Sequence, residues 1–443
     1  MLEGATLDIR YVKRWYQRNF GGFSPTDAEY RRLTSELLVY DDTLVRTEGS
    51  DNFLKLDGEY RKTSASGAER KKYEPSPEQF PLRDADTLQP LTLAAGESRQ
   101  LWVTLYLPEG AAAGQYTAGI EIRHDDEVLA TVPVTVEVLP FRLADSVVEY
   151  SIFYRGYLDG QRPEGTPSSE AKSREQLLAD FRNLRAHGVT NPLMYQRYKL
   201  GLIEDVIQLR QEAGLDNQRI YYLGVNVVDN DEGEIRQRLG SEVRDVVGIA
   251  REYGAQEVYF FARDEARGQK ITYQFPFWEE VRRNGGKIFA AGWQDTQAEP
   301  GNFSVTDGEE DLFISLGTLS RAEAARWHSK GKRIASYMNP AGGQELPRTW
   351  RRNYGLLLWQ HDYDASMPYV WQHSYADGWN DFSHYRHRAQ NFTYPTVDGP
   401  IDTAAWEGFR EGVDDVRYLS TLLQLLQSDS ARRMPGYAAA SAW

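Results

Sequence analysis

Short runs of alternating apolar and polar residues fill the N-terminal part of the chain, and each run ends in Gly, Pro or Asp. A period of two is typical of antiparallel strands, and no helical period interrupts it before about residue 140. We therefore predict an N-terminal antiparallel β-sandwich over residues 1–142. The expected strands include residues 7–15, 101–107, 116–122 and 128–139.

From residue 143 to residue 443, short β-rich runs alternate regularly with amphipathic stretches. This alternation predicts α/β architecture, namely a (β/α)8 barrel of the TIM type. The expected strands are 148–157, 189–195, 220–227, 257–262, 287–293, 312–316, 333–339 and 368–374. The expected helices include 173–187, 203–213, 234–253, 321–329, 350–358 and 403–426.

Composition excludes several classes of protein. The 443 residues include 51 Lys and Arg against 65 Asp and Glu, a net charge of −14, so a general nucleic-acid binder is not expected. No apolar run approaches the length of a membrane span. Aromatic residues make up 12% of the chain, which suits stacking on sugars as well as ordinary core packing.

Cofactor and metal motifs are missing from the sequence. Cysteine is absent, which excludes thiolate metal ligands, cysteine nucleophiles and Cys-ligated iron–sulfur clusters. His384 and His387 are three residues apart, but no set of carboxylates completes a zinc site around them. Phosphate-binding and dinucleotide-binding motifs are also missing. We therefore expect no cofactor and no metal ion.

The N-terminus begins almost directly in strand-like sequence at Leu7 and contains no apolar signal-peptide region. We expect further N-terminal residues in the gene product that complete the sandwich. A secreted or periplasmic location follows if a signal peptide has been removed, and a cytoplasmic location follows otherwise. The sequence does not give the oligomeric state.

The strongest candidate for chemistry follows the fourth expected barrel strand, where the apolar run 257–262 leads into Asp264 and Glu265. Active-site residues of such barrels follow the C-terminal ends of the strands. Neighbouring residues on a regular strand point to opposite faces, so the strand must end or bulge near Ala262 if both carboxylates are to reach one substrate. The alternative is a solvated loop or a helix cap.

Two neighbouring carboxylates can hydrolyse a glycosidic bond, with one as general acid and the other as nucleophile, base or orienting group. A retaining barrel with an enzyme nucleophile needs a second carboxylate about 5 Å from the acid. We expect that carboxylate after the seventh strand, where the sequence Tyr337-Met338-Asn339 contains no acid. This absence favours substrate assistance, in which a 2-acetamido carbonyl oxygen attacks the anomeric carbon. Asp264 would then hold the acetamido N–H, and Glu265 would protonate the leaving oxygen.

Three features together resemble glycoside hydrolase family 123, which includes β-N-acetylgalactosaminidases. They are the Asp264-Glu265 pair, the sandwich end at residues 134–141 and the run from Trp406 to Asp415. The resemblance implies a sandwich followed by a catalytic barrel, with Asp264 as stabiliser and Glu265 as acid/base. It also implies an oligosaccharide or glycoconjugate substrate with a β-linked 2-acetamido sugar, GalNAc first. The pair is followed by Ala266-Arg267-Gly268 where we expect a proline or similar residue, so galacto or gluco configuration and exo or endo action stay open.

Other polar and aromatic residues follow the fifth, seventh and eighth expected strands and are candidates for sugar contact, with core packing as the alternative for each. These candidate substrate-binding residues are Trp293, Tyr337, Asn339, Trp371, His373, Tyr375, Trp379 and Asn380. Glu407 and Arg410 lie in the first turns of the last expected helix. They are candidates for positioning the residues that touch the substrate, or for an internal ion pair.

Two rival hypotheses remain. The protein is an active hydrolase for a sugar without an acetamido group, or it is a carbohydrate-binding protein without activity. In the second case Arg263 and Arg267 would neutralise the carboxylate pair in a structural ion network.

Overall fold

The structure of the chain is a computed structural model. It describes residues 3–18, 31–63, 81–160, 167–225, 232–294, 303–340, 342–343, 345–374, 378–382, 388–429 and 431–442.

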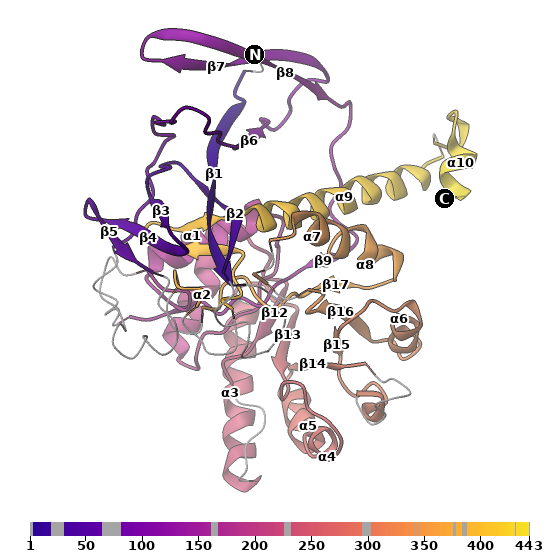
Figure 1. Cartoon of the computed structure of the whole chain (residues 1–443). Helices are drawn as coiled ribbons and strands as arrows, with labels where there is room; N and C mark the ends of the chain where they lie inside the picture. Colours follow the sequence, from indigo (N-terminus) through magenta and orange to yellow (C-terminus); the bar gives the residue numbers. More distant parts are fainter. Residues whose placement is uncertain are drawn as a thin grey trace.

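A seven-stranded parallel sheet forms the centre of the described molecule (Figure 1). The segment 190–194 lies between its two edges, because Thr190 N–H donates to the Tyr150 carbonyl (3.0 Å) and Met194 N–H donates to the Tyr221 carbonyl (2.8 Å). The sheet therefore curls into a TIM-like barrel, as the sequence predicts. In sheet order the strands are β12 (Arg219–Tyr222), β13 (Glu257–Phe261), β14 (Lys287–Trp293), β15 (Leu312–Leu316), β16 (Arg333–Tyr337), β17 (Ala365–Ser366) and β9 (Glu149–Tyr150).

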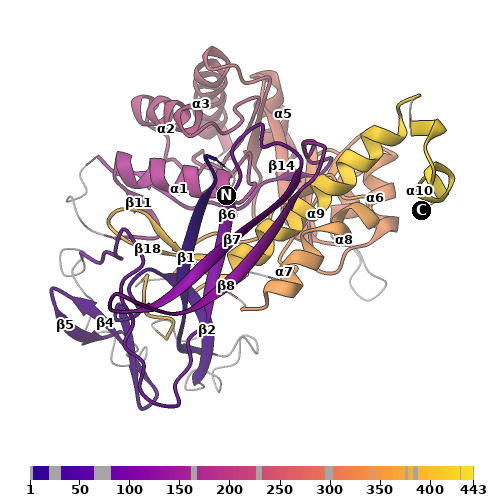
Figure 2. The ribbon, with the colours of Figure 1, turned by 90° about the horizontal axis from the view of Figure 1, so that it is seen from above.

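Helices surround the barrel on its outer face (Figures 1 and 2). The first begins at a capping box in which Ser173 and Gln176 satisfy each other's backbone N–H groups. The helices are α1 (Arg174–Ala186), α2 (Leu200–Glu212), α3 (Glu232–Glu252), α4 (Gln269–Thr272), α5 (Phe275–Arg283), α6 (Arg321–His328), α7 (Pro347–Asn353), α8 (Leu356–Gln360), α9 (Ala404–Leu426) and α10 (Tyr437–Ala442), with 3₁₀ turns at Phe303–Thr306 and Ala431–Arg433.

Several predicted elements differ from the structure. The expected strand 148–157 is reduced to β9, and the expected strand 220–227 ends already at Tyr222. The expected helix 350–358 is divided into α7 and α8 at Gly355, where α9 passes so closely that an added Cβ would lie 3.0 Å from the Gly412 Cα. The expected strand 368–374 is wrong, because the strand that pairs with β16 in the sheet is β17, which lies earlier in the chain at Ala365–Ser366. The expected strand 189–195 is reduced to a single bridge between Met194 and Tyr222.

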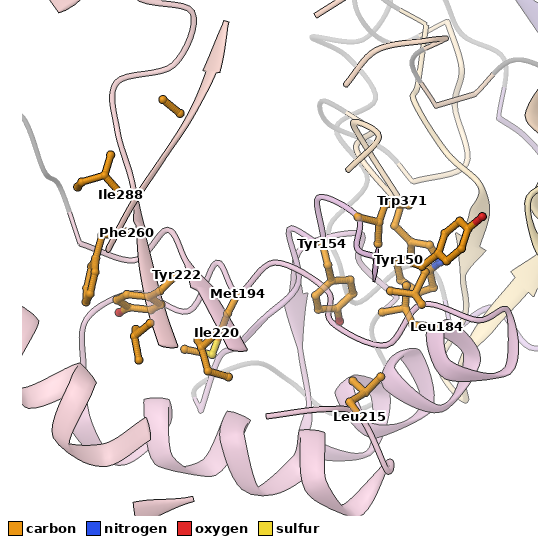
Figure 3. Packing of buried hydrophobic residues seen from close by; sticks show 14 of the residues in the cluster. Tyr150, Tyr154, Leu184, Met194, Leu215, Ile220, Tyr222, Phe260, Ile288 and Trp371 are labelled. Atoms are coloured by element: carbon orange, nitrogen blue, oxygen red, sulfur yellow. The ribbon is translucent and has the colours of Figure 1, made fainter. Parts of the chain in front are cut away.

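Two apolar layers enclose the parallel sheet. Successive residues of a strand point to opposite faces, so Tyr259 and Phe261 of β13 enter the barrel interior while Phe260 faces the helices. Figure 3 shows the outer layer, in which Phe260 lies with Ile288 and Tyr222. The interior layer ends just below the C-terminal rim of the barrel at Tyr337.

The N-terminal part consists of small antiparallel sheets. The predicted β-sandwich is not confirmed. The hairpin β7–β8 stands apart from the barrel in Figure 1, and most of its residues are exposed on both faces. The predicted domain boundary after residue 142 stays a prediction. The first sheet holds β2 (Arg31–Val39), β1 (Thr6–Arg18) and β6 (Leu101–Tyr106), the second holds β3 (Val45–Glu48), β4 (Asp51–Leu56) and β5 (Glu59–Lys62), and the hairpin holds β7 (Gly114–His124) and β8 (Glu127–Val138).

Two short strand pairs complete the described elements. They are β10 (Tyr157–Leu158) with β11 (Ala171–Lys172), and β18 (Thr393–Pro395) with β19 (Pro400–Asp402). Tyr394 of β18 packs edge-on against Trp15 of β1, with ring centroids 4.9 Å apart, so the N-terminal sheets share a core with this part of the chain. In the described part of the chain, no helix combines the length and apolarity that crossing a bilayer requires.

Candidate active site

Asp264 and Glu265 lie where β13 leaves the sheet at the C-terminal rim. β13 ends at Phe261, which confirms the predicted end near Ala262. Ala262 N–H donates to the Phe289 carbonyl of β14 (2.9 Å), and Glu265 N–H donates to the Ala291 carbonyl (3.0 Å). Between these two hydrogen bonds the segment after β13 advances by three residues, while β14 advances by two. The segment after β13 therefore contains one extra residue, which is the geometry of a bulge.

The extra residue is accommodated by an uncommon backbone conformation at Glu265, whose φ is 44°. A residue other than glycine rarely adopts a positive φ, and backbone strain of this kind is concentrated at functional sites. The bulge turns two sequence neighbours toward the same rim, which a regular strand would not do.

The charge of the pair is not neutralised. Among the described residues, no ion pair reaches Asp264 or Glu265. The Asp264 side chain is accessible to solvent, yet protein atoms surround it on most sides. This partial loss of water, followed by the negative charge of Glu265, raises the pKa of Asp264 to about 6.

Tyr337, at the end of β16, lies close enough to the pair to respond to its charge. Burial, then the charges of Asp264 and Glu265, raise the pKa of the Tyr337 phenol above its ordinary value. Within the described part of the chain the Tyr337 hydroxyl has no hydrogen-bond partner. The structure therefore brings Tyr337 together with both carboxylates and leaves its hydroxyl available to a bound molecule.

A second group of polar residues lies on the same rim. Arg155 Nε donates to Glu170 (2.7 Å), and its Nη1 donates to the Tyr369 hydroxyl (3.3 Å). That hydroxyl shares a hydrogen bond of 2.8 Å with His373 Nδ1. Arg155 also covers the ring of Tyr195 at 5.3 Å.

Tyr195 connects this group to the carboxylate pair. Burial raises the pKa of Tyr195, and Asp264 and Glu170 both add to that rise, so each carboxylate lies within electrostatic reach of this one phenol. Phe153 packs against Tyr337 and Tyr369 at 5.4 Å each and forms the apolar floor between them.

Trp293 is the last residue of β14 and remains 37% exposed, so it can offer a ring face to a ligand. It follows Ala291, the residue that accepts the Glu265 N–H, by two positions and therefore shares its face. The guanidinium of Arg267 lies over the Trp293 ring at 5.1 Å.

Several predicted contact residues lie elsewhere. Trp371 is fully buried in the outer layer, packed on Tyr154 at 5.3 Å (Figure 3), so it has no face to offer a sugar. Trp379 is buried against Trp15 of the N-terminal sheet, with its ring 5.7 Å away. The predictions of sugar contact at Trp371 and Trp379 are wrong because both side chains serve packing.

The remaining candidates are tied to other parts of the fold. Asn380, next to Trp379, is buried and accepts the Phe382 N–H. Asn339 accepts a hydrogen bond from the Asn353 amide. Tyr375 lies outside the described residues, as do His384 and His387.

Glu407 and Arg410 do not support the pair. Glu407 bonds to Arg410 (2.7 and 2.8 Å) and faces His187 at the end of α1, on the outer surface of the barrel wall. The structure therefore favours the internal ion pair that the sequence left as an alternative.

Arg155, Glu170, Tyr195 and Tyr369 were not predicted. Tyr195 is the last residue of the expected strand 189–195, so its position at a strand end could have marked it, whereas Tyr369 lies near the start of the expected strand 368–374 and had no such signal. Glu170 lies outside every expected strand and helix, and no sequence signal points to it.

Comparisons with known proteins give distant likenesses of fold. No protein-family model and no curated protein matches the sequence. Among solved structures, a β-glucuronidase from Bifidobacterium dentium is 12% identical, with a TM-score of 0.38, 71% of this chain covered and 56% of that chain. A β-glucuronidase from Parabacteroides merdae is 9% identical, with a TM-score of 0.37 and coverages of 74% and 46%. A GH5_18 protein from Bifidobacterium longum subsp. infantis is 10% identical, with a TM-score of 0.39 and coverages of 54% and 73%.

The chain spans about half the length of the two β-glucuronidases. At TM-scores below 0.4 these likenesses carry no argument about activity. The argument for function therefore depends on the geometry of the rim.

Proposed function

We propose that this protein is a glycoside hydrolase that releases a β-linked 2-acetamido sugar, GalNAc first, by substrate-assisted retaining hydrolysis. The observation that carries the proposal is the bulge after β13, which turns Asp264 and Glu265 to one rim with no ion pair to any described residue. A carboxyl group with a raised pKa, as Asp264 has, next to a second carboxylate is typical of catalytic sites.

The two carboxylates divide the work. The acetamido carbonyl oxygen of the substrate attacks the anomeric carbon, and the bond to the leaving oxygen breaks as Glu265 donates its proton to that oxygen. Asp264 accepts a hydrogen bond from the acetamido N–H and stabilises the positive charge of the oxazolinium intermediate. Water then opens the intermediate, and a proton from that water molecule passes to Glu265.

The Tyr337 hydroxyl, to which no described residue bonds, supports an acetamido subsite, since it can donate to the carbonyl oxygen of that group. Trp293, with its exposed ring, supports a stacking contact on the sugar.

A non-catalytic ion network is the less favoured alternative. Guanidinium groups that neutralised the pair would lower the pKa of Asp264, because an opposite charge favours the ionised form. The pKa of Asp264 is raised instead, to about 6.

Glu170 supports the other alternative, a hydrolase for sugars without an acetamido group. It is a second carboxylate within electrostatic reach of Tyr195, as Asp264 is, and could act as an enzyme nucleophile. Its ion pair with Arg155 (2.7 Å) makes it a weaker nucleophile than an unpaired carboxylate. With azide present, Glu170→Ala should yield no glycosyl azide; a glycosyl azide of inverted configuration would favour this alternative.

Leaving-group dependence tests the division of roles. Glu265→Gln should lose about 10²–10⁴-fold in kcat/KM on a substrate with a poor leaving group. It should lose much less on an activated aryl glycoside, whose leaving group needs little protonation. Asp264→Asn impairs formation of the oxazolinium itself and should slow both substrates to a similar degree.

Inhibition by a thiazoline that mimics the oxazoline is the second test. Mimics of reaction intermediates bind far more tightly than substrates, so wild-type protein should be inhibited strongly and Asp264→Asn weakly. Equal leaving-group sensitivity of the two variants, combined with no thiazoline inhibition, would contradict substrate assistance.

A further inference from the structure

Three potential metal ligands meet on the outer side of the barrel wall, away from the carboxylate pair. His187 follows the last turn of α1, Asp402 ends β19, and Glu407 lies in the first turn of α9. Each residue is 5% exposed, and their ligand atoms all lie within 4.8 Å of one another. The sequence did not predict this group because its members come from three separate elements.

The hydrogen bond on the far side of the His187 ring determines what the near side can do. Nδ1 lies 2.9 Å from the Asn183 carbonyl oxygen, which only accepts, so Nδ1 carries the proton. In the neutral imidazole, Nε2 then presents a lone pair. Metal-bound histidines almost always donate their other N–H to a backbone carbonyl or carboxylate in this way.

Nε2 faces the Glu407 carboxylate without bonding to it. The distance from Nε2 to Glu407 Oε1 is 3.3 Å, and Nε2 is a buried atom with no hydrogen-bond partner among the described residues. A charge-assisted hydrogen bond would be shorter, about 2.7–2.9 Å. When the imidazole is neutral, two lone pairs therefore face each other across a gap, and a metal ion or a proton between them would remove their repulsion.

The size of the gap fits a metal ion. Two ligands about 2.0–2.1 Å from a tetrahedral zinc ion lie about 3.3–3.4 Å apart. The His187–Glu407 separation of 3.3 Å has this value. Asp402 supplies a third ligand, and water can take the fourth position.

Outer partners already orient all three ligands. Arg410 donates twice to Glu407 Oε2, which leaves Oε1 toward His187. Asn183 Nδ2 donates to Asp402 Oδ1 (2.7 Å), and Arg10 donates to Oδ2 (3.1 Å). The two guanidinium charges offset the two carboxylates, so binding would depend on directed lone pairs and favour an imidazole-seeking ion over Mg²⁺ or Ca²⁺.

We propose that His187, Glu407 and Asp402 form a zinc-binding site that ties the end of α1 to the start of α9. The site is independent of the proposed glycosidase activity. Gly188, the residue after His187, lines a cavity of about 830 Å³ at the N-terminal side of the barrel.

The test uses the whole chain, freed of metal with a chelator, incubated with Zn²⁺ and separated from excess ion. Elemental analysis should find one zinc per chain, and calorimetric titration should show Zn²⁺ binding and no Mg²⁺ binding. Co²⁺ should give the visible absorption bands of a tetrahedral site. His187→Gln should weaken zinc binding by more than about 100-fold, since even loss of an outer partner costs about 10–100-fold.

His361→Gln is the matched control. His361 follows the last turn of α8, and its Nδ1 lies 2.9 Å from the Leu357 carbonyl oxygen, so it repeats the ring geometry of His187. It belongs to no cluster of ligands among the described residues. This variant should bind zinc as the wild type does.

If His187→Gln does not fold, Glu407→Gln and Asp402→Asn test the same site and should each weaken zinc binding by at least tenfold. Less than one zinc per chain at saturating Zn²⁺ would overturn the proposal, as would unchanged binding in all three variants. A proton on His187 Nε2 in nitrogen NMR at neutral pH, with no zinc affinity, would show that a proton bridges the gap instead.

Discussion

The two ends of the barrel hold carboxylates in opposite electrostatic settings. At the N-terminal end, Glu149 lies 2.6 Å from both Arg219 and Arg333. Burial raises the pKa of Glu149, but Arg333 and Arg219 outweigh it, so the pKa lies below its ordinary value. At the C-terminal end, burial and Glu265 raise the pKa of Asp264 to about 6. One carboxylate is paired for stability, and the other is left unpaired where chemistry is proposed.

The two settings have opposite effects on stability as pH changes. The pKa of Glu149 is lower in the folded state, so its contribution is present above the unfolded pKa and is lost as pH falls through the folded pKa. The pKa of Asp264 is higher in the folded state, so the folded protein loses stability as pH rises from about 4 to about 6.

The largest expected effect on stability is that of Glu149→Gln. It should lower the free energy of unfolding by about 2 kcal/mol, because it leaves the half-buried guanidinium of Arg333 without its carboxylate partner among the described residues, while Arg219 keeps its ion pair with Glu257 (2.7 Å). Urea denaturation at pH 7 measures this. Glu265→Gln, at the opposite end, should not lower stability, and equal destabilisation by the two variants would remove the contrast between the ends.

The pH dependence of kcat/KM should report the carboxylate pair. Strongly interacting carboxyl groups titrate as a unit, and the productive form holds one proton. The pKa of Asp264 is about 6, so the form of the pair that holds one proton is lost above about pH 6, and kcat/KM should fall about tenfold per pH unit there. In Glu265→Gln, loss of the neighbouring charge should move the pKa of Asp264 downward, which carboxyl NMR shifts can follow.

Tyr337→Phe should cost less, up to about tenfold in kcat/KM, the value of one neutral hydrogen bond. Tyr259→Phe is the matched control, because Tyr259 shares the interior face but its hydroxyl lies 3.4 Å from Glu257 at the N-terminal end. Tyr259→Phe should leave kcat/KM unchanged. A loss as large as that of Tyr337→Phe would mean that interior packing, and not the rim hydroxyl, is responsible.

The smallest effect is expected from Asp264→Asn on stability. A neutral amide avoids the cost of ionising a carboxyl with a raised pKa, so Tm should rise at pH 7 and stay the same at pH 4. Solvent access to Asp264 screens the effect, so the rise should be small. A lower Tm at pH 7 would show that the Asp264 carboxylate is stabilising.

Much of the barrel could be predicted from sequence, because its strands are buried on both faces and read as apolar runs. The apolar run 257–262 predicted β13 and its end at the rim, and the two adjacent carboxylates predicted that the strand ends or bulges before Glu265. The α7–α8 division could not be predicted, since it depends on the close approach of α9 to Gly355.

The positions of rim residues could be predicted where the residues end or directly follow a strand, and were missed where tertiary packing decides. Tyr337 and Trp293 end barrel strands, Asp264 and Glu265 follow the end of β13, and all four lie on the rim. Trp371 and Trp379 were misassigned because an aromatic side chain reads the same in sequence whether it faces solvent or core. His187 and Glu407 are brought together only by folding, so their spacing along the chain carries no signal.

The most direct test of the central claim is hydrolysis of a matched pair of activated aryl β-glycosides, one with a 2-acetamido group and one with a 2-hydroxyl group. The account predicts turnover of the acetamido substrate, lost in Asp264→Asn and retained in part in Glu265→Gln, with little turnover of the hydroxyl substrate. Turnover of the hydroxyl substrate alone would contradict substrate assistance. No turnover of either sugar, in galacto or gluco configuration, would contradict the assignment of a hydrolase.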